Sequence, residues 1–362
     1  MNFPPPPLPP GPIYPPVRKP SRSLNFGLFL LAGLWIIAAN RIADSAAQGI
    51  TTTLPINMLS PLLQPAFLLF LLLLGLTAIS RLHSRTVTLR TTAGLPKRPT
   101  EGEEFQCGTA LGWALALAAV IPMMLTGALH PEFWLGPRNW LPTVISLVAI
   151  AIGTLAAEIA FRGYLYTRLI AAIGTVAATL LVSLIYACAS LIHPNSSPLS
   201  MAVAFFTSIL LCIAWQRTHA LWIGWGLHFG WAATTAILLG LPSAGDASLP
   251  TLLTTSVSGP DWLSGGPYGP DGAFLTLVLR LLAIIVLYRI TRDYAWNYTH
   301  PEIVSAGYPM DIAPPAAHTA MEKAAAPAPL VQILGSTPTE ASTMPVIDDH
   351  IRSTRDTDPP SE

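Results

Sequence analysis

Long apolar runs constrain this chain more than any other feature of its sequence. A helix needs about 20 apolar residues to cross a bilayer. Charged residues make up only 10% of the sequence, whereas an ordinary soluble domain has about 25%. The sequence therefore predicts an all-α fold, a polytopic membrane bundle of about eight transmembrane helices. The candidate segments are 24–40, 61–80, 107–127, 141–171, 175–193, 198–216, 219–240 and 272–290.

Both ends of the chain differ in composition from this apolar region. Residues 1–23 are rich in proline, which favours an extended chain, and residues 293–362 mix Pro, Ala, Ser and Thr with scattered charges. We therefore expect a disordered leader (1–23), a membrane domain (24–292) and a disordered tail (293–362). A cleaved signal peptide at 24–40 is an alternative, but the proline-rich leader is unlike the usual start of such a peptide.

The distribution of Lys and Arg predicts how the helices cross the membrane. Three of the 19 basic residues lie in the leader and five lie in the loop 81–98. If both segments face the cytoplasm, an even number of spans leaves only Arg41 and Arg138 on the opposite side, in agreement with the positive-inside rule. We therefore expect both termini in the cytoplasm. The formal net charge of zero gives no indication of a nucleic-acid partner. The apolar segments make the lipid bilayer the expected partner.

One acidic residue stands alone in the apolar region. Glu158 is the only Asp or Glu between Trp140 and Gly240, and Arg162 follows it one helical turn later. A charged side chain at the centre of a membrane helix costs about 2.5–3.5 kcal/mol on insertion scales, so such residues usually have a function. Their i,i+4 spacing also allows a plain ion pair that packs helices together. The spacing alone is compatible with both interpretations.

Two histidines and a second arginine are the other strongly polar residues predicted within the membrane. With a rise of about 1.5 Å per residue, Glu158 lies about 20 Å, His193 about 25 Å and His228 about 14 Å above the cytoplasmic ends of their helices. The sequence therefore predicts that these three side chains converge. Each His could instead bond a neighbouring helix, and Arg280 could pair with Glu158 or extend to the membrane interface.

The residue types at this predicted site are those of a hydrolytic centre. One Glu and two His are a known ligand set for catalytic zinc, and the same groups can position and activate a water molecule. The sequence contains no H-E-x-x-H helix, which excludes the zincin arrangement, and no G-x-S-x-G elbow for a serine nucleophile. Spacing therefore predicts an intramembrane polar site that binds a metal or activates water, and it does not choose between the two.

Three motifs around these residues resemble those of a known family. They are Glu158-Ile-Ala-Phe-Arg162-Gly, a helix that ends in His193, and Leu-His228-Phe-Gly-Trp. Over about residues 100–290 the sequence resembles the CPBP intramembrane proteases, the Abi or CAAX prenyl endopeptidase group. That family has the pattern E-E-x-x-x-R, then F-x-x-x-H, then H-x-x-x-N or H-x-x-x-D.

The resemblance implies catalytic roles for Glu158, Arg162, His193 and His228. In the family, the first glutamate and the first histidine activate a water that attacks a peptide carbonyl, while the second histidine and the Asn stabilise the oxyanion. The resemblance also implies that zinc or another divalent metal is held by Glu158, His193 and His228. It places such a protein in a bacterial inner membrane.

The chain departs from the family pattern at three positions. Ala157 stands where the first glutamate is expected, Ala189 replaces the phenylalanine of the second motif, and Ala232 replaces the final Asn or Asp. Losing a general base usually lowers the rate about 10²–10⁴-fold, and losing one oxyanion donor lowers it about 10²–10³-fold. The resemblance therefore predicts the fold more directly than it predicts the activity.

Two classes of function follow from these observations. The first is an intramembrane endopeptidase that cleaves peptide bonds of membrane-associated substrates, with its activity reduced or lost through Ala157 and Ala232. The second is a non-catalytic membrane protein on the same fold, which binds a partner or confers self-immunity. A transporter is disfavoured because the apolar segments show no internal repeat. The sequence does not identify the peptide or protein substrate.

Overall fold

The computed structural model describes residues 21–54, 56–83, 87–133, 140–246, 249 and 251–299. The chain divides into two units, 1–295 and 296–362, and the second contributes only the last turn of one helix to the described residues. The predicted disorder of the leader and the tail falls largely outside these residues. Where the predicted ends are described they are helical, since one helix begins at Arg22 and another continues to Thr299.

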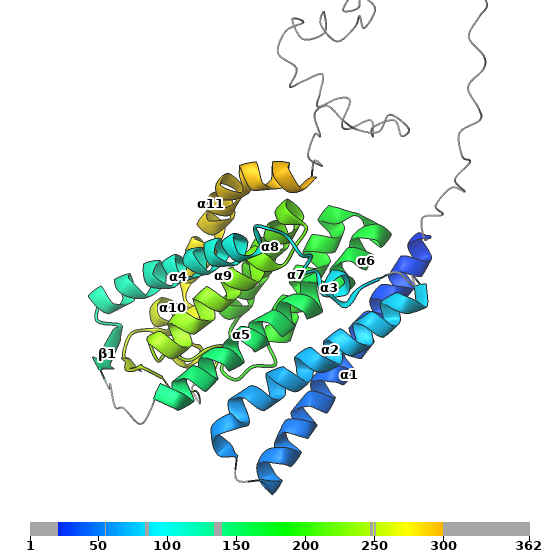
Figure 1. Ribbon diagram of the computed structural model, residues 1–362. Helices are drawn as coiled ribbons and strands as arrows, with labels where there is room; N and C mark the ends of the chain where they lie inside the picture. The colour runs from blue at the N-terminus through cyan, green and yellow to red at the C-terminus, as the bar shows by residue number, and fades with distance from the viewer. Residues whose placement is uncertain are drawn as a thin grey trace, which may run out of the picture. The chain divides into compact units, whose positions relative to one another are not determined.

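Helices form nearly all of the regular structure in the described residues (Figure 1). The α-helices are α1 (Arg22–Thr53), α2 (Ser60–His83), α3 (Leu89–Ala93), α4 (Glu101–Leu125), α5 (Trp140–Arg162), α6 (Tyr164–Ile173), α7 (Thr175–Ser190), α8 (Pro198–Thr218), α9 (Trp222–Ala232), α10 (Asp261–Ser264) and α11 (Phe274–Thr299). The short helical segments are η1 (Asn57–Leu59), the π-helical η3 (Ala233–Leu238), η4 (Gly266–Tyr268) and η5 (Pro270–Gly272). Two strands, β1 (Leu129–Phe133) and β2 (Leu253–Val257), pair antiparallel with Leu129 opposite Val257.

The predicted fold class, an all-α polytopic membrane bundle, is confirmed. Each of the eight predicted segments coincides largely with helix, and six helical segments of the described chain are long and apolar enough to cross a membrane. These six are Arg22–Thr53, Ser60–Leu82, Glu101–Leu125, Trp140–Ile173, Pro198–Thr218 and Phe274–Arg292. The other two are shorter than predicted: α7 has only 16 residues, about 24 Å of helix, and the segment 219–240 is divided between α9 and η3.

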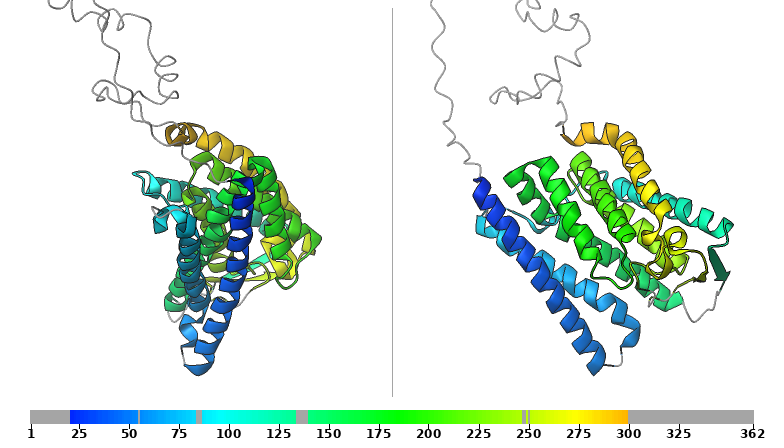
Figure 2. Two further views of the ribbon diagram at one scale, coloured as in Figure 1. Left: turned by 90° about the vertical axis from the view of Figure 1, so that its right-hand side faces the viewer. Right: turned by 180° about the vertical axis from the view of Figure 1, so that it is seen from behind.

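The first two helices form a long hairpin, in which α1 and α2 lie side by side (Figure 2). The indole of Trp35 on α1 donates a hydrogen bond to the carbonyl of Leu71 on α2 (3.0 Å). The same ring occupies the space beside Gly75, where a Cβ would collide with it. The missing side chain of Gly75 therefore lets a large aromatic residue of α1 lie against the α2 backbone.

Contacts between loops group the helix ends into two sets. On one side, the backbone N–H of Leu221 donates to the carbonyl of Gly94 (2.9 Å), and the Trp222 indole donates to the carbonyl of Pro96 (3.2 Å). On the other side, β1 follows α4 and pairs with β2, which follows η3. The described part of the basic loop 81–98 therefore shares a side with the turn between α8 and α9, as an even number of crossings requires.

The closest helix contact joins α4 to α9, which lie alongside each other (Figure 1). Glycines face each other across it: Gly108 and Gly112 on α4, and Gly226 and Gly230 on α9. A Cβ at any of these four positions would collide with a backbone carbonyl oxygen of the opposite helix. Small residues at four-residue spacing let membrane helices approach to backbone contact. This contact fixes the position of α9, a helix of only 11 residues.

The predicted topology can be tested with reporter fusions. The distribution of Lys and Arg and the grouping of the loops predict that fusions after Arg98 and after Ser258 report opposite sides of the membrane, with Arg98 in the cytoplasm. A reporter active only in the cytoplasm and one active only outside it would be fused at each position. If both positions report the same side, the number of crossings between them is not odd and the predicted orientation is wrong.

The contact between α4 and α9 predicts a sharp difference between two glycines of α4. Gly112→Val forces a branched side chain against the α9 backbone, so we expect destabilisation of at least about 1–3 kcal/mol, the usual effect of overpacking. Gly102→Val is the matched control, because a Cβ there meets nothing within 4 Å. Thermal unfolding in detergent and the yield of folded protein would measure both effects. Equal stability of the two variants would contradict the close contact.

Candidate functional site

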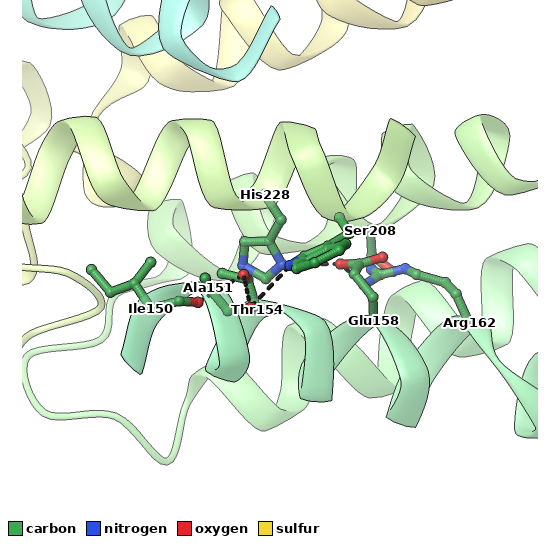
Figure 3. A network of polar contacts seen from close by, with 8 residues as sticks. Ile150, Ala151, Thr154, Glu158, Arg162, Ser208 and His228 are labelled. Atoms are coloured by element: carbon green, nitrogen blue, oxygen red, sulfur yellow. Dashed lines mark hydrogen bonds and ion pairs between the residues drawn. The ribbon is translucent and has the colours of Figure 1, made fainter. Parts of the chain in front are cut away.

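Glu158 lies at the centre of a polar network inside the helical bundle (Figure 3). Its side chain on α5 is fully buried, and its Oε1 accepts a hydrogen bond from Arg162 Nη1 (3.0 Å). The same oxygen lies 2.9 Å from Nδ1 of His228 on α9. Because an ionised carboxylate only accepts hydrogen bonds, Nδ1 carries the proton in this contact. Two groups from different helices therefore share one carboxylate oxygen.

Arg162 extends the network to two further helices. Its Nη2 donates to the hydroxyl of Ser208 on α8 (2.9 Å), and its guanidinium carbon lies 4.8 Å from the ring centroid of Tyr186 on α7. The arginine side chain is fully buried, as Glu158 is. Gly163 follows directly and marks the break between α5 and α6. Side chains of α5, α7, α8 and α9 thus surround one buried ion pair.

His228 is the partly exposed member of the network. Its side chain is 19% exposed, whereas those of Glu158 and Arg162 are 0% exposed. The indole of Trp225, one turn earlier on α9, donates to the carbonyl of Ala151 on α5 (2.9 Å) and joins the two helices there. With Nδ1 held by the carboxylate, Nε2 is the ring nitrogen left free for chemistry.

The comparison with protein families agrees with this site. Residues 138–234 match the model of the Rce1-like family, type II CAAX prenyl endopeptidase. The match begins just before α5 and ends in η3, so it contains the whole of the Glu158 network. The resemblance stated from the motifs is confirmed for this segment. No curated protein and no solved structure gives a significant match to the chain.

Within the Rce1-like segment, the contacts of the described residues join Glu158, Arg162 and His228 and do not include the side chain of His193. α7 ends at Ser190, and His193 lies in the exposed turn that follows, with its backbone N–H bonded to the carbonyl of Ser190 (3.2 Å). The prediction that three side chains converge assumed a helix up to His193. The next residue is Pro194, which disfavours helical conformation in the residue before it. Glu158 and His228 therefore meet without His193.

The Rce1-like segment also does not assemble the metal set that the resemblance implies. Among the described residues, no group of three or more His, Cys, Asp or Glu side chains is placed to hold a metal ion. Of Glu158, His193 and His228, only the first and last are in contact, and the shared Glu158 oxygen is also held by Arg162. These donors do not fit a zinc site. The groups that remain for chemistry are the side chains themselves and any water that reaches them.

A second polar cluster joins α9 to residues that follow the Rce1-like segment, and sequence patterns did not predict it. Arg280 on α11 pairs with Asp271 of η5 (3.4 Å) rather than with Glu158, the partner considered from the sequence. Asp271 also accepts a hydrogen bond from the indole of Trp231 on α9 (3.1 Å). Ser208 was missed as well, because one hydroxyl in an apolar helix has no distinctive spacing. The only sequence signal for the cluster was an arginine within the last apolar segment.

The buried ion pair predicts a strong dependence of stability on its two charges. Glu158→Gln leaves Arg162 as a buried cation without a counter-charge, and breaking such a pair typically destabilises a protein by about 3–5 kcal/mol. The matched variant Glu158→Gln/Arg162→Met removes both charges, so its folded yield should recover. Size-exclusion profiles and thermal unfolding in detergent would compare the two. A Glu158→Gln protein as stable as wild type would show that the pair does not stabilise the fold.

Proposed function

We propose that the chain is an intramembrane endopeptidase that hydrolyses peptide bonds of membrane-associated substrates at a reduced rate. The observation that carries this proposal is the contact of Glu158 with Nδ1 of His228, on a ring that remains partly exposed. A carboxylate that orients an imidazole in this way leaves Nε2 as a general base and stabilises the imidazolium that forms. The Rce1-like match supports the peptide bond as the target.

The proposed reaction needs no group beyond these side chains and one water molecule. Nε2 of His228 takes a proton from the water as its oxygen attacks the carbonyl carbon of the substrate, and the carbonyl electrons move onto oxygen. The tetrahedral intermediate collapses when His228 returns the proton to the leaving nitrogen and the C–N bond breaks. Glu158 holds the ring throughout, and Arg162 balances the carboxylate charge in the apolar surroundings.

The proposed setting is a bacterial inner membrane with both termini in the cytoplasm. The six long apolar helices and the Rce1-like match identify an integral membrane protein. The orientation rests on the positive-inside rule. The kind of membrane rests on the resemblance to the bacterial family. The bilayer is then the medium in which substrate reaches His228.

A second candidate is a non-catalytic membrane protein on the same fold, acting in partner binding or self-immunity. The observation in its favour is the loss of polar groups at two motif positions. Ala157 and Ala232 are both partly exposed and carry only methyl groups where the resemblance implies a base and an oxyanion donor. The position of His193 outside the network adds to this. Catalytic measurements separate the two candidates.

The deciding measurement is proteolysis by the purified protein in liposomes, with labelled casein and a farnesylated CAAX-type peptide as probes. We expect slow cleavage by wild type and faster cleavage by Ala157→Glu/Ala232→Asn, since each restored group is worth about 10²-fold or more. His228→Ala should abolish cleavage in both backgrounds.

His193→Ala is the matched histidine control and should leave the rate unchanged, because His193 lies in an exposed turn and the contacts of Glu158 and His228 do not include it. A loss of activity in this variant would support the role that the resemblance implies for His193. If wild type and the double variant are both folded and inactive, the endopeptidase proposal fails and the non-catalytic candidate stands.

A further inference from the structure

Arg280 is held in one orientation by two contacts. Its guanidinium carbon lies 3.8 Å from the ring centroid of Trp231, and its Nη2 donates to Asp271 Oδ1 (3.4 Å). The other oxygen of Asp271 accepts from the Trp231 indole (3.1 Å), so one carboxylate fixes both side chains. A cation on an aromatic ring uses the flat face of the guanidinium and leaves its N–H edges available for hydrogen bonds.

Those remaining N–H edges have no partner. Arg280 is 2% exposed, and neither its Nε nor its Nη1 has a hydrogen-bond partner among the described residues. Leaving a buried charged donor unsatisfied costs more than the 1–3 kcal/mol or so of a neutral one, so such groups are rare without a function. Two fixed and unfilled donors on a cation form a binding position for a negatively charged oxygen.

This position lies close to the proposed base. Trp231, which carries the guanidinium on its ring, is three residues after His228 on α9, and residues at that spacing are neighbours with about 5–6 Å between Cβ atoms. The polar network of α5 and the Arg280 cluster therefore border one region.

We infer that Arg280 is the oxyanion donor of this site. The inference rests on the proposed function, because hydrolysis of a peptide bond places a negative charge on the carbonyl oxygen in the intermediate. Ala232 has no side-chain donor to meet that charge. The free Nε and Nη1 of Arg280 hydrogen-bond the oxygen as the attacking water gives its proton to His228, and release it when the C–N bond breaks.

Arg162 is the other buried cation beside the site, and it is less suited to this role. Its Nη1 and Nη2 already donate to Glu158 and Ser208, so only Nε is unfilled. An oxyanion beside Arg162 would also face the Glu158 carboxylate, which binds that arginine at 3.0 Å. Arg280 contacts the Asp271 carboxylate at 3.4 Å, and that carboxylate is 28% exposed. Because water screens an exposed carboxylate, more of the positive charge of Arg280 is available to an oxyanion.

The test measures kcat and KM of Arg280→Gln on labelled casein in liposomes, in wild type or, if wild type is too slow, in the Ala157→Glu background. An oxyanion donor acts in the transition state, so kcat should fall about 10²–10³-fold with KM unchanged. Arg217→Gln is the matched control. Like Arg280, Arg217 lies over an aromatic ring, in this case that of Tyr288 on α11 (4.6 Å). Its guanidinium is hydrogen-bonded to Thr291, away from the site, so the Arg217→Gln variant should retain kcat.

A rescue variant separates catalysis from a purely structural role. Ala232→Asn adds a new donor on α9, so in the Arg280→Gln background it should recover at least about 10-fold in kcat if the lost function is oxyanion binding. Arg280→Lys keeps the charge and serves if Arg280→Gln does not fold. It should retain part of kcat, because one ammonium can still meet the oxyanion.

Three results would overturn the inference. A folded Arg280→Gln protein with wild-type kcat excludes a role in the reaction. A rise in KM with kcat unchanged shows that Arg280 instead anchors a negatively charged group of the substrate. A loss in kcat that Ala232→Asn does not recover shows a structural role. If neither wild type nor any variant cleaves casein, the proposed function itself fails. If His228→Ala abolishes cleavage and Arg280→Gln leaves kcat unchanged, the proposed function stands and only the inference about Arg280 is refuted.

Discussion

A single oxygen of Glu158 holds the centre of this bundle together. It accepts from Arg162 on its own helix and from His228 on α9, while Arg162 reaches Ser208 on α8. None of these helices can shift without breaking a charged contact in surroundings where water cannot replace it. Attraction between charges is several-fold stronger there than at a wet surface. The ion pair considered from the sequence is therefore both structural and positioned for chemistry, because its acidic partner also orients the histidine.

The glycine contact between α4 and α9 determines where that histidine lies. α9 has only 11 residues and continues into the π-helical η3, so its own length provides little anchoring. Gly226 and Gly230 lie on either side of His228 in the sequence and press the α9 backbone onto α4. The imidazole then projects from the opposite part of the helix, towards α5. π-Helical turns are frequently found at functional sites, and η3 begins directly after the last motif position.

The sequence predicted the elements of this fold better than it predicted their ends. Apolar length identified each of the long helices, and the i,i+4 spacing identified the contact between Glu158 and Arg162. The predicted helix end at His193 was wrong, because α7 stops at Ser190, and Pro194 was a signal for that earlier end. The depth estimate succeeded for His228 because α9 extends past it by four residues.

The partner of Arg280 was beyond sequence reasoning for a different reason. Asp271 lies in a turn of glycines and prolines, where no periodicity relates a residue to its neighbours in space. Gly269 has a φ of +92°, a conformation that side chains rarely adopt, and it leads directly into η5. The chain then enters η5, where the Asp271 carboxylate pairs with Arg280 of α11.

The two charge clusters each place one charged side chain where hydrolysis would need it. A general base requires negative charge behind the imidazole, and Glu158 supplies it at 2.9 Å. The carbonyl oxygen of the substrate requires a positively charged donor beside it. Arg280 has two unfilled donors and lies over Trp231, one turn after His228 on α9. A cation with only a structural role in a membrane helix would fill its donors or extend to the interface. Arg280 does neither, because Trp231 and Asp271 hold it in place. This fixed, unfilled cation is a second reason, beside the contact of Glu158 with His228, to regard the site as more than a packing ion pair.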